Sequence, residues 1–137
     1  MTETTTEVQP AIAAAVIVHE GRVLLVRRRV KEGSLSWQFP AGAVEAGESR
    51  EAAAVRETLE ETGLKVRAIK LLGERVHPAT GRTMSYTACE VLEGTALVGD
   101  AEELDAVEWL EHGQLAERVP YGFYEPVQEH LDATLKH

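Results

Sequence analysis

Residues 42–64 read GAVEAGESREAAAVRETLEETGL, and this stretch decides how the whole chain is interpreted. Ser49 is a favourable helix N-cap, and residues 50–62 contain neither Gly nor Pro. Gly63 then supplies a helix stop, after which Leu64 can pack back onto the helix. The sequence therefore predicts a helix that begins after Ser49 and ends at Gly63.

The predicted helix carries two different faces. Three apolar residues recur at helical spacing and predict the buried face: Ala52, Val55 and Leu59. Glu57, Glu60 and Glu61 stand at i, i+3 and i+4, which puts three carboxylates one turn apart on the opposite face. Like charges so placed repel each other and weaken the helix unless something neutralises them.

A divalent metal ion would turn this repulsion into binding. Mg²⁺ prefers oxygen ligands, and Glu48, one or two turns earlier, can reach the same neighbourhood. Arg56 gives one nearby cation, better suited to orienting a glutamate by a bidentate contact than to neutralising the whole cluster. On charge alone, a solvated acidic surface is the alternative to a metal site. The residues around the carboxylates are needed to distinguish the two.

The composition of the chain limits its function. Its 137 residues fit one compact domain, expected at residues 10–137 after a flexible tail at residues 1–9. A net charge of −9 repels nucleic-acid backbones, so binding of DNA or RNA is not expected, whereas a small anionic substrate bound through cations is compatible with it.

Neither export nor membrane insertion is expected. The longest apolar run, Ala11–Val18, is too short to span a bilayer, and the polar N-terminus does not resemble a secretory signal. A lone Cys89 leaves no internal disulfide and fits a reducing compartment, so a cytoplasmic location is expected. Whether the chain is a monomer or a homodimer is left open.

Strands and helices are interleaved along the rest of the chain, which predicts an α/β fold with a central mixed β-sheet between helices. The predicted elements outside the acidic helix are a hairpin (Ala11–His19 and Val23–Arg29, joined at Glu20–Gly21), a polar loop (Lys31–Ser36), a short extended piece (Trp37–Phe39), a loop (Ala41–Gly47), strands (Val66–Leu72, Thr83–Leu92 and Ala106–Leu110) and helical segments (Glu111–Arg118 and Glu125–Leu135, the second with Val127, Leu131 and Leu135 inward).

The order of residues in 42–64 resembles the Nudix box. That pattern is a Gly, five residues, a Glu, seven residues, and then Arg-Glu-apolar-x-Glu-Glu-x-Gly-apolar. Every fixed Gly, Glu and Arg is present at its spacing, and the one departure is Thr58, where the family usually has an aliphatic residue. The resemblance implies the Nudix α/β/α sandwich and an enzyme that cleaves the diphosphate linkage of a nucleoside diphosphate derivative with Mg²⁺, or alternatively Mn²⁺.

The resemblance also implies roles for residues of the box. The metal ligands would be Gly42, through its carbonyl, and Glu57, Glu60, Glu61 and Glu48. Arg56 would orient Glu57. The attacking water would be activated either by a glutamate of the box or by an acid of the later loop, where Glu103 is the favoured candidate and Glu102 the next. A plain solvated role for both loop acids is the alternative.

Substrate contacts are expected from residues outside the box. Arg27 is favoured over Arg28 and Arg29 as a phosphate contact, with a surface role as the alternative. Phe39, Tyr86 and Tyr124 are candidates for contacting a base or ribose, and so is Trp37, although aromatic residues at strand spacing often belong to the core. Cys89 is interpreted as a buried strand residue, and His77 and His112 as surface histidines.

The identity of the substrate stays open at this level. Ala41 after Phe39-Pro40 is common among family members that act on ADP-ribose and nucleotide sugars, whereas the stretch Tyr124–Val127 looks like that of bacterial oxidised-dGTP hydrolases. Tyr124 cannot offer the paired hydrogen-bond donor and acceptor of an amide, which argues against specific recognition of an oxidised guanine. A nucleoside triphosphate or a modified nucleotide is favoured, with ADP-ribose or a nucleotide sugar and a non-catalytic nucleotide sensor as alternatives.

Overall fold

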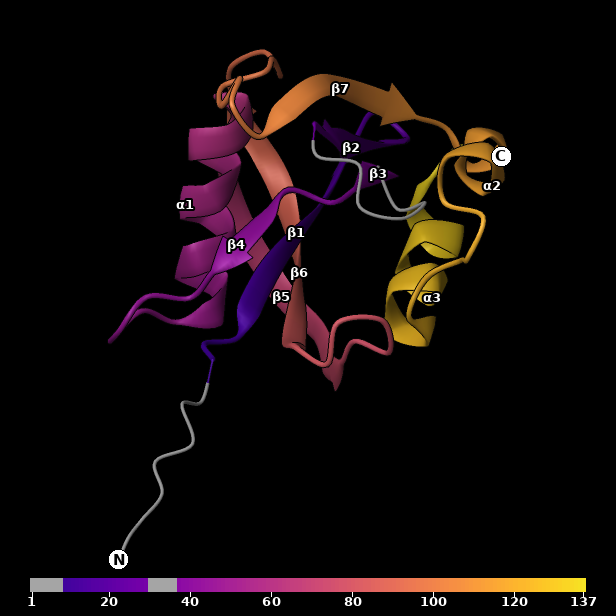
Figure 1. Cartoon of the computed structure of the whole chain (residues 1–137). Coiled ribbons are helices and arrows are strands. Elements are labelled where there is room, and N and C mark those ends of the chain that lie inside the picture. The colour runs from indigo at the N-terminus through magenta and orange to yellow at the C-terminus, as the bar shows by residue number, and fades with distance from the viewer. Residues whose placement is uncertain (1–8, 30–36) are drawn as a thin grey trace, which may run out of the picture.

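The computed structural model describes residues 9–29 and 37–137 and arranges them as a mixed seven-stranded sheet with helices on both faces (Figure 1). The strands are β1 (Ile12–His19), β2 (Arg22–Arg28), β3 (Trp37–Gln38), β4 (Ala41–Ala43), β5 (Lys65–Val76), β6 (Thr83–Glu93) and β7 (Leu104–Leu110). The helices are α1 (Arg50–Thr62), the 3₁₀ turn η1 (His112–Gln114), α2 (Leu115–Arg118) and α3 (Glu125–Thr134). The predicted polar loop Lys31–Ser36, and the predicted tail except residue 9, lie outside the described residues.

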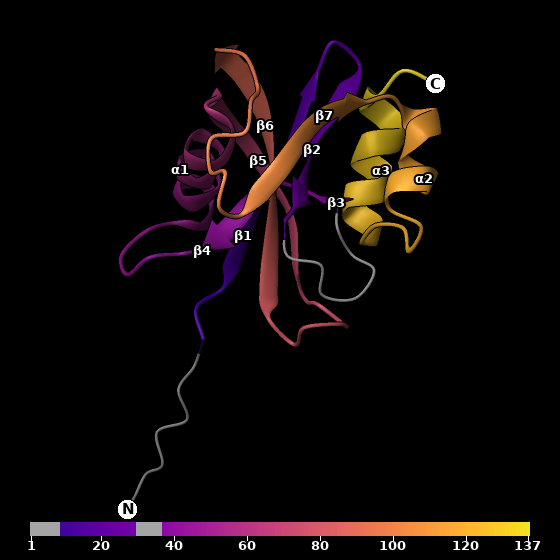
Figure 2. The same cartoon turned by 45° about the horizontal axis from the view of Figure 1, so that its top comes forward.

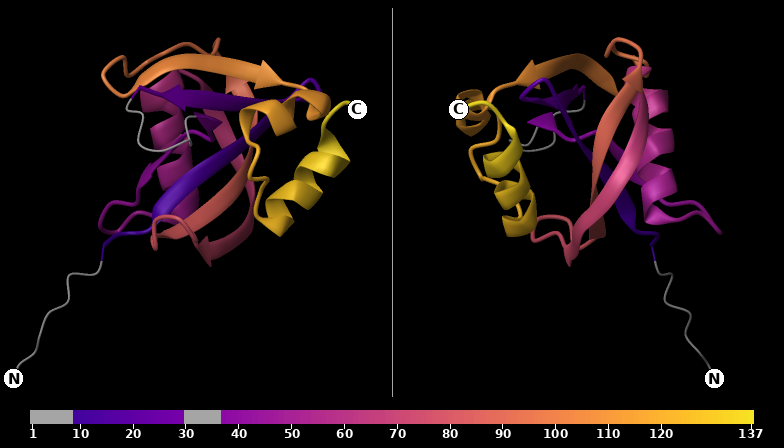
Figure 3. Two further views of the ribbon diagram at one scale, coloured as in Figure 1. Left: turned by 45° about the vertical axis from the view of Figure 1, so that its right-hand side comes forward. Right: turned by 180° about the vertical axis from the view of Figure 1, so that it is seen from behind.

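β1 is the centre of the sheet. One edge pairs in parallel with β6, and the other edge pairs antiparallel with β4 at its start and with β2 at its end. Beyond these neighbours, β5 pairs antiparallel with β6, and β2 pairs with both β3 and β7. Figure 2 shows α1 on one side of the sheet and α2 and α3 on the other, and both views of Figure 3 show the same order of layers. The predicted sandwich with a mixed sheet is confirmed.

The alternation of side chains along β1 supplies both halves of the core. Ala13, Ala15 and Ile17 face α1, where they pack with Ala53 and Ala54. The even-numbered residues of β1 face the opposite side and pack with inward residues of α3: Ala14 and Val16 with Val127, Leu131 and Leu135. The inward face predicted for the closing helix is therefore confirmed, and the predicted hairpin is also present, with positive φ at Glu20 and Gly21.

The buried face of α1 differs from the prediction. Leu59 is 53% exposed, and the helix instead buries a stripe of mostly small residues: Ala53, Ala54, Thr58, Glu61 and Thr62. Small side chains let the helix approach the alanines of β1 closely. Thr58 and Thr62 can be buried because each hydroxyl donates to a carbonyl one turn earlier, at 2.8 and 2.7 Å. The carboxylates were expected on the face opposite the core, which is wrong for Glu61.

Other predicted boundaries also shift. Residues 41–47 were expected as loop, but Ala41–Ala43 pair with the start of β1, because the extended backbone after Pro40 meets a free strand edge. β5 runs four residues beyond the predicted end at Leu72, to Val76. The predicted helical segment Glu111–Arg118 is divided into η1 and α2. Within the described residues, no helix is long and apolar enough to cross a membrane.

Candidate functional site

Glu61 is a buried carboxylate near the C-terminal end of α1. The residue is 5% exposed, and its Oε1 atom accepts a hydrogen bond from the Ala41 amide at 3.3 Å. Burial raises the pKa of Glu61 to about 7, and the Arg28 guanidinium offsets this only in part. A buried charge needs close partners of opposite charge. Because Arg28 offsets the cost of burial only in part, ionised Glu61 lacks sufficient positive charge around it.

Glu57 lies directly against Gly42 of β4. A Cβ atom at position 42 would lie 2.1 Å from the carboxyl carbon of Glu57, so the missing side chain makes room for this carboxylate. Burial raises the pKa of Glu57 as well, although the hydrogen bond from Arg56 acts in the opposite direction. Two of the predicted metal ligands are thus held in contact by the packing of α1 on β4.

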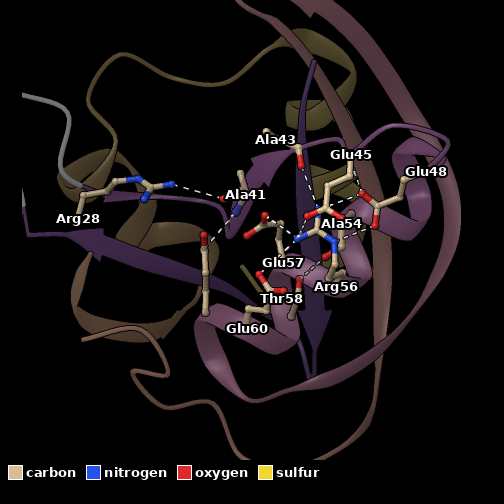
Figure 4. Close-up of polar contacts among 11 residues, drawn as sticks. Arg28, Ala41, Ala43, Glu45, Glu48, Ala54, Arg56, Glu57, Thr58 and Glu60 are labelled. Carbon is tan, nitrogen blue, oxygen red and sulfur yellow. Dashed lines mark hydrogen bonds and ion pairs between the residues drawn. The ribbon is translucent and has the colours of Figure 1, made fainter. Parts of the chain in front are cut away.

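Arg56 lies at the centre of the remaining carboxylates (Figure 4). Its Nε and Nη2 atoms donate to the two carboxylate oxygens of Glu48 at 2.8 and 2.9 Å, and Nη2 also donates to the Ala43 carbonyl at 3.0 Å. Its Nη1 atom donates to Glu57 at 3.0 Å and to Glu60 at 3.3 Å. The bidentate contact expected of Arg56 is present, and its acceptor is Glu48. This contact is the main reason why the pKa of Glu48 falls to about 2.

The donor set fits a hard divalent cation in its chemistry and charge. The side chains that could bind it offer only oxygen ligands: Glu48, Glu57, Glu60 and Glu61. Arg56 contributes one positive charge, which offsets part of their negative charge. Within the described ranges, no three His, Cys, Asp or Glu side chains converge into a ready-made metal site. Instead, three of the four carboxylates are bonded to Arg56, so a metal ion would have to compete with this guanidinium for their oxygens.

The loop after β6 is hydrogen-bonded to the C-terminal end of α1. The Gly99 amide donates to the Glu61 carbonyl at 2.7 Å, and a Cβ at position 99 would lie 2.8 Å from the Glu60 carbonyl oxygen. The same loop carries Glu103, whose carboxylate accepts a hydrogen bond from Arg28 at 3.1 Å. The charge of Glu103 contributes to the raised pKa of Glu61, so the structure brings this loop acid close to the acidic helix.

The arginines at the end of β2 point to different places. Arg27 donates to Asp105 at 2.7 Å, and its guanidinium carbon lies 5.4 Å from the centre of the Trp37 ring. Arg28 points towards β4, with Nη2 at 3.5 Å from the Ala41 carbonyl oxygen, and its charge partly offsets the burial that raises the pKa of Glu61 on α1. Arg27 was favoured over Arg28 from the sequence, and strand alternation already predicts that the two point to opposite faces. A register shift between them adds to the separation.

A cavity of about 740 Å³ lies on the α3 side of the sheet, lined by residues of the sheet, of the turn between β5 and β6, of α3 and of the segment preceding it. Its lining includes all four aromatic residues that were candidates for substrate contact: Trp37, Phe39, Tyr86 and Tyr124. This volume suits a small-molecule ligand. Ala41 lines the cavity and also donates its amide to Glu61, so one residue joins the cavity to the carboxylates.

The remaining candidates are distributed around the molecule. Cys89 is buried, as predicted, and burial raises the pKa of its thiol to about 12, which argues against a nucleophile. His112 pairs with Asp132 at 2.7 Å. His77 was interpreted as a surface residue, but it is half-buried and lines the cavity, because β5 and the following turn bring it there. Arg75 also lines the cavity and is not among the residues predicted from the sequence.

Comparison with known proteins gives consistent matches. Residues 8–130 match the family model described as the NUDIX domain. A "MutT-like protein" of Streptomyces ambofaciens is 28% identical over 127 residues, which cover 93% of this chain and 79% of that protein. A protein of Myxococcus xanthus named "Octanoyltransferase" is 38% identical over 109 residues, 74% of this chain but only 30% of that protein.

The fold is shared with solved structures of NUDIX hydrolases. The crystal structure of a NUDIX hydrolase from Nitrosomonas europaea superimposes with a TM-score of 0.75 at 22% identity, covering 93% of this chain and 73% of that one. At this level of identity the likeness bears on the fold.

Proposed function

The chain belongs to the Nudix family, and we propose that it is a magnesium-dependent pyrophosphohydrolase that cleaves the diphosphate linkage of a nucleoside diphosphate derivative. The observation that carries the proposal is the pair of carboxylates, Glu57 and Glu61, which the packing of α1 on β4 removes from water without giving them enough positive charge. A protein gains nothing in stability from such an arrangement, whereas a cation-binding site requires it.

Mg²⁺ would be held by the carboxylates of α1, with Glu48 in support and the Gly42 carbonyl as a further oxygen. When bound, the ion would neutralise the phosphate oxygens and the charge that develops on them during hydrolysis. Arg56 keeps Glu48, Glu57 and Glu60 in one group and prevents their mutual repulsion from spreading them apart. Its role in this proposal is to position the ligands.

Glu103 is the proposed acceptor of the proton from the attacking water. Its side chain is 60% exposed, so water can reach it, and its contact with Arg28 keeps it near the buried end of the acidic helix. Glu102 and the box glutamates Glu57 and Glu60 are the alternatives. A Glu103→Gln variant should lose the acid limb of the pH profile of kcat while retaining metal binding, whereas an unchanged profile would transfer the role to Glu102, Glu57 or Glu60.

A nucleoside triphosphate or a modified nucleotide is the proposed substrate, with its base in the aromatic cavity and its phosphates towards α1. Ala41 supports this direction because it belongs both to the cavity wall and to the surroundings of Glu61. The phosphate contact predicted for Arg27 is retained as part of the proposal. ADP-ribose or a nucleotide sugar is the alternative substrate class.

The proposal is tested by measuring release of phosphate, pyrophosphate and nucleoside monophosphate with Mg²⁺ or Mn²⁺ from a panel of nucleotides. The panel contains nucleoside triphosphates, ADP-ribose, dinucleoside polyphosphates and nucleotide sugars. Turnover of at least one compound, lost in Glu60→Gln and retained in Glu51→Gln on the same helix, is the expected result. No turnover of any compound by the wild-type protein would instead favour a non-catalytic nucleotide sensor.

A further inference from the structure

The wall of the cavity formed by β5 contains a guanidinium group. Antiparallel pairing sets Gly73 opposite Tyr86 and Arg75 opposite Met84, and these residues lie on the cavity side of the sheet. Glu74, between them, points away and bonds to Arg50 at 2.9 Å. Strand alternation therefore brings Arg75 into the cavity and keeps the neighbouring carboxylate out of it.

Arg75 is held by aromatic rings. Its guanidinium carbon lies 5.8 Å from the centre of the Tyr86 ring and 5.1 Å from that of Tyr124. Its only hydrogen bonds are long ones to the Tyr86 hydroxyl, at 3.4 and 3.3 Å, counted over the described residues. Within the same residues no carboxylate lies within 4.0 Å of Arg75, whereas four carboxylates lie within this distance of Arg56. Arg75 thus has donor capacity left for a ligand.

The rings beside Arg75 form a fixed wall. Tyr124 donates its hydroxyl to the Glu74 carbonyl at 3.1 Å, and it packs where Gly73 has no side chain, since a Cβ there would lie 3.0 Å from the ring. The centres of the Tyr86 and Tyr124 rings are 5.5 Å apart, and those of Phe39 and Phe123 are also 5.5 Å apart. Such walls favour a planar, aromatic ligand.

We propose that Arg75 is the specificity-determining residue of this cavity and that it selects a 6-oxopurine base over adenine. This inference rests on the proposed function, which places a nucleotide base in the cavity. An arginine can only donate hydrogen bonds. Guanine and hypoxanthine present adjacent acceptors, O6 and N7, which match its bidentate donor geometry. Adenine presents a 6-amino donor at the position of O6, so one donor would face another.

The charge of the cavity favours a neutral base over a second phosphate group as the partner of Arg75. Burial and the neighbouring Arg75 lower the pKa of His77, which keeps this imidazole neutral near pH 7. Among the described residues that line the cavity, Arg75 is therefore the only positive charge. Phosphate sites usually combine several charged or backbone donors, whereas one guanidinium beside aromatic rings suits the acceptor edge of a base.

The test compares binding of IMP and AMP, which share ribose and phosphate and differ in the six-membered ring, by isothermal titration to the full chain without metal. The wild-type protein should bind IMP at least about tenfold more tightly, the lower range of what one bidentate pair discriminates. Arg75→Met should bring the ratio close to one by weakening IMP binding alone. Arg67→Met, the same change on the same strand outside the cavity, should keep the ratio, and circular dichroism checks that each variant is folded.

Three results would overturn the inference: no measurable binding of either nucleotide, a wild-type ratio near one, or an Arg75→Met variant that loses IMP and AMP equally, as a phosphate contact would. Mononucleotide binding does not require hydrolysis. A protein that turns over nucleotides without preferring IMP contradicts this inference alone, and a protein that prefers IMP but hydrolyses nothing contradicts the proposed enzyme alone.

Discussion

Gly42 and Glu57 are in such close contact that the missing side chain of the first determines where the carboxylate of the second lies: a Cβ at position 42 would come within 2.2 Å of Glu57 Oε2. Gly42 is not in the left-handed region of φ, so an alanine there would conflict with Glu57 and not with its own backbone.

Gly42→Ala is therefore expected to displace Glu57 and to lower Mg²⁺-dependent turnover by about tenfold or more, as misplacement of a metal ligand or its support does. Gly113→Ala serves as the matched control, since a Cβ at Gly113 would meet nothing within 4 Å. Steady-state kinetics at several Mg²⁺ concentrations would check this. Equal turnover of both variants would show that the position of Glu57 is unimportant.

Gly99 gives a separate prediction about the loop that carries Glu103. Gly99→Ala would bring a Cβ to 2.8 Å from the Glu60 carbonyl oxygen, so the loop has to move while α1 stays packed on the sheet. A lower kcat with nearly unchanged Mn²⁺ affinity is expected, the latter measured by electron paramagnetic resonance. A variant with wild-type kcat would argue that the loop does not take part in the reaction.

The buried Glu61 predicts how the stability of the metal-free protein changes with pH. Its pKa is raised from 4.5 to about 7 in the folded state, so its favourable contribution is fully present below pH 4.5 and is lost as the pH rises through 7. Over this range the loss is on the order of 3 kcal/mol at most. Glu57 acts in the same direction, whereas the lowered pKa values of His77 and His130 act in the opposite one.

Comparison with Glu61→Gln isolates this contribution, because the other groups are common to both proteins. In EDTA, urea unfolding should show the variant gaining stability relative to wild type between pH 5 and pH 8. Addition of Mg²⁺ at pH 8 should stabilise wild type more than the variant. A difference in stability that does not change with pH would mean that the Glu61 carboxyl titrates normally.

Two hydroxyl groups under α1 provide a prediction about stability alone. Ser85 and Thr87 are fully buried, and their hydroxyls have no hydrogen-bond partner among the described residues. Thr87→Val removes such a group at constant shape and should stabilise the protein by about 1 kcal/mol. Thr58→Val, which removes a bonded hydroxyl, should not stabilise it. Urea unfolding compares the two, and equal destabilisation would mean that Thr87 has a partner.

The sequence predicts the acidic helix and its ends well because the signals are local. Ser49 caps the helix through the Ala52 amide at 3.0 Å, and Gly63 adopts a φ of 76° at its end. The buried face was predicted wrongly because apolar spacing overlooks threonines that satisfy their own hydroxyls, as Thr58 does.

Contacts between distant segments were harder to predict. Arg28 reaches Ala41 only because β2 and β4 share the same edge of β1, and a register shift turns the end of β2. Arg75 enters the cavity because an extended β5 and the Tyr124 segment meet there. No local pattern around either arginine reveals these neighbours.

The most direct test of α1 as a catalytic metal centre is a Mg²⁺ titration of nucleotide hydrolysis by the wild-type protein, Glu61→Gln and Glu51→Gln. Glu51 lies on the same helix in its first turn and serves as the control. Hydrolysis that requires Mg²⁺, falls at least about a hundredfold in Glu61→Gln and is retained in Glu51→Gln is the predicted result. Hydrolysis that proceeds equally well in Glu61→Gln, or without a divalent ion, would contradict it.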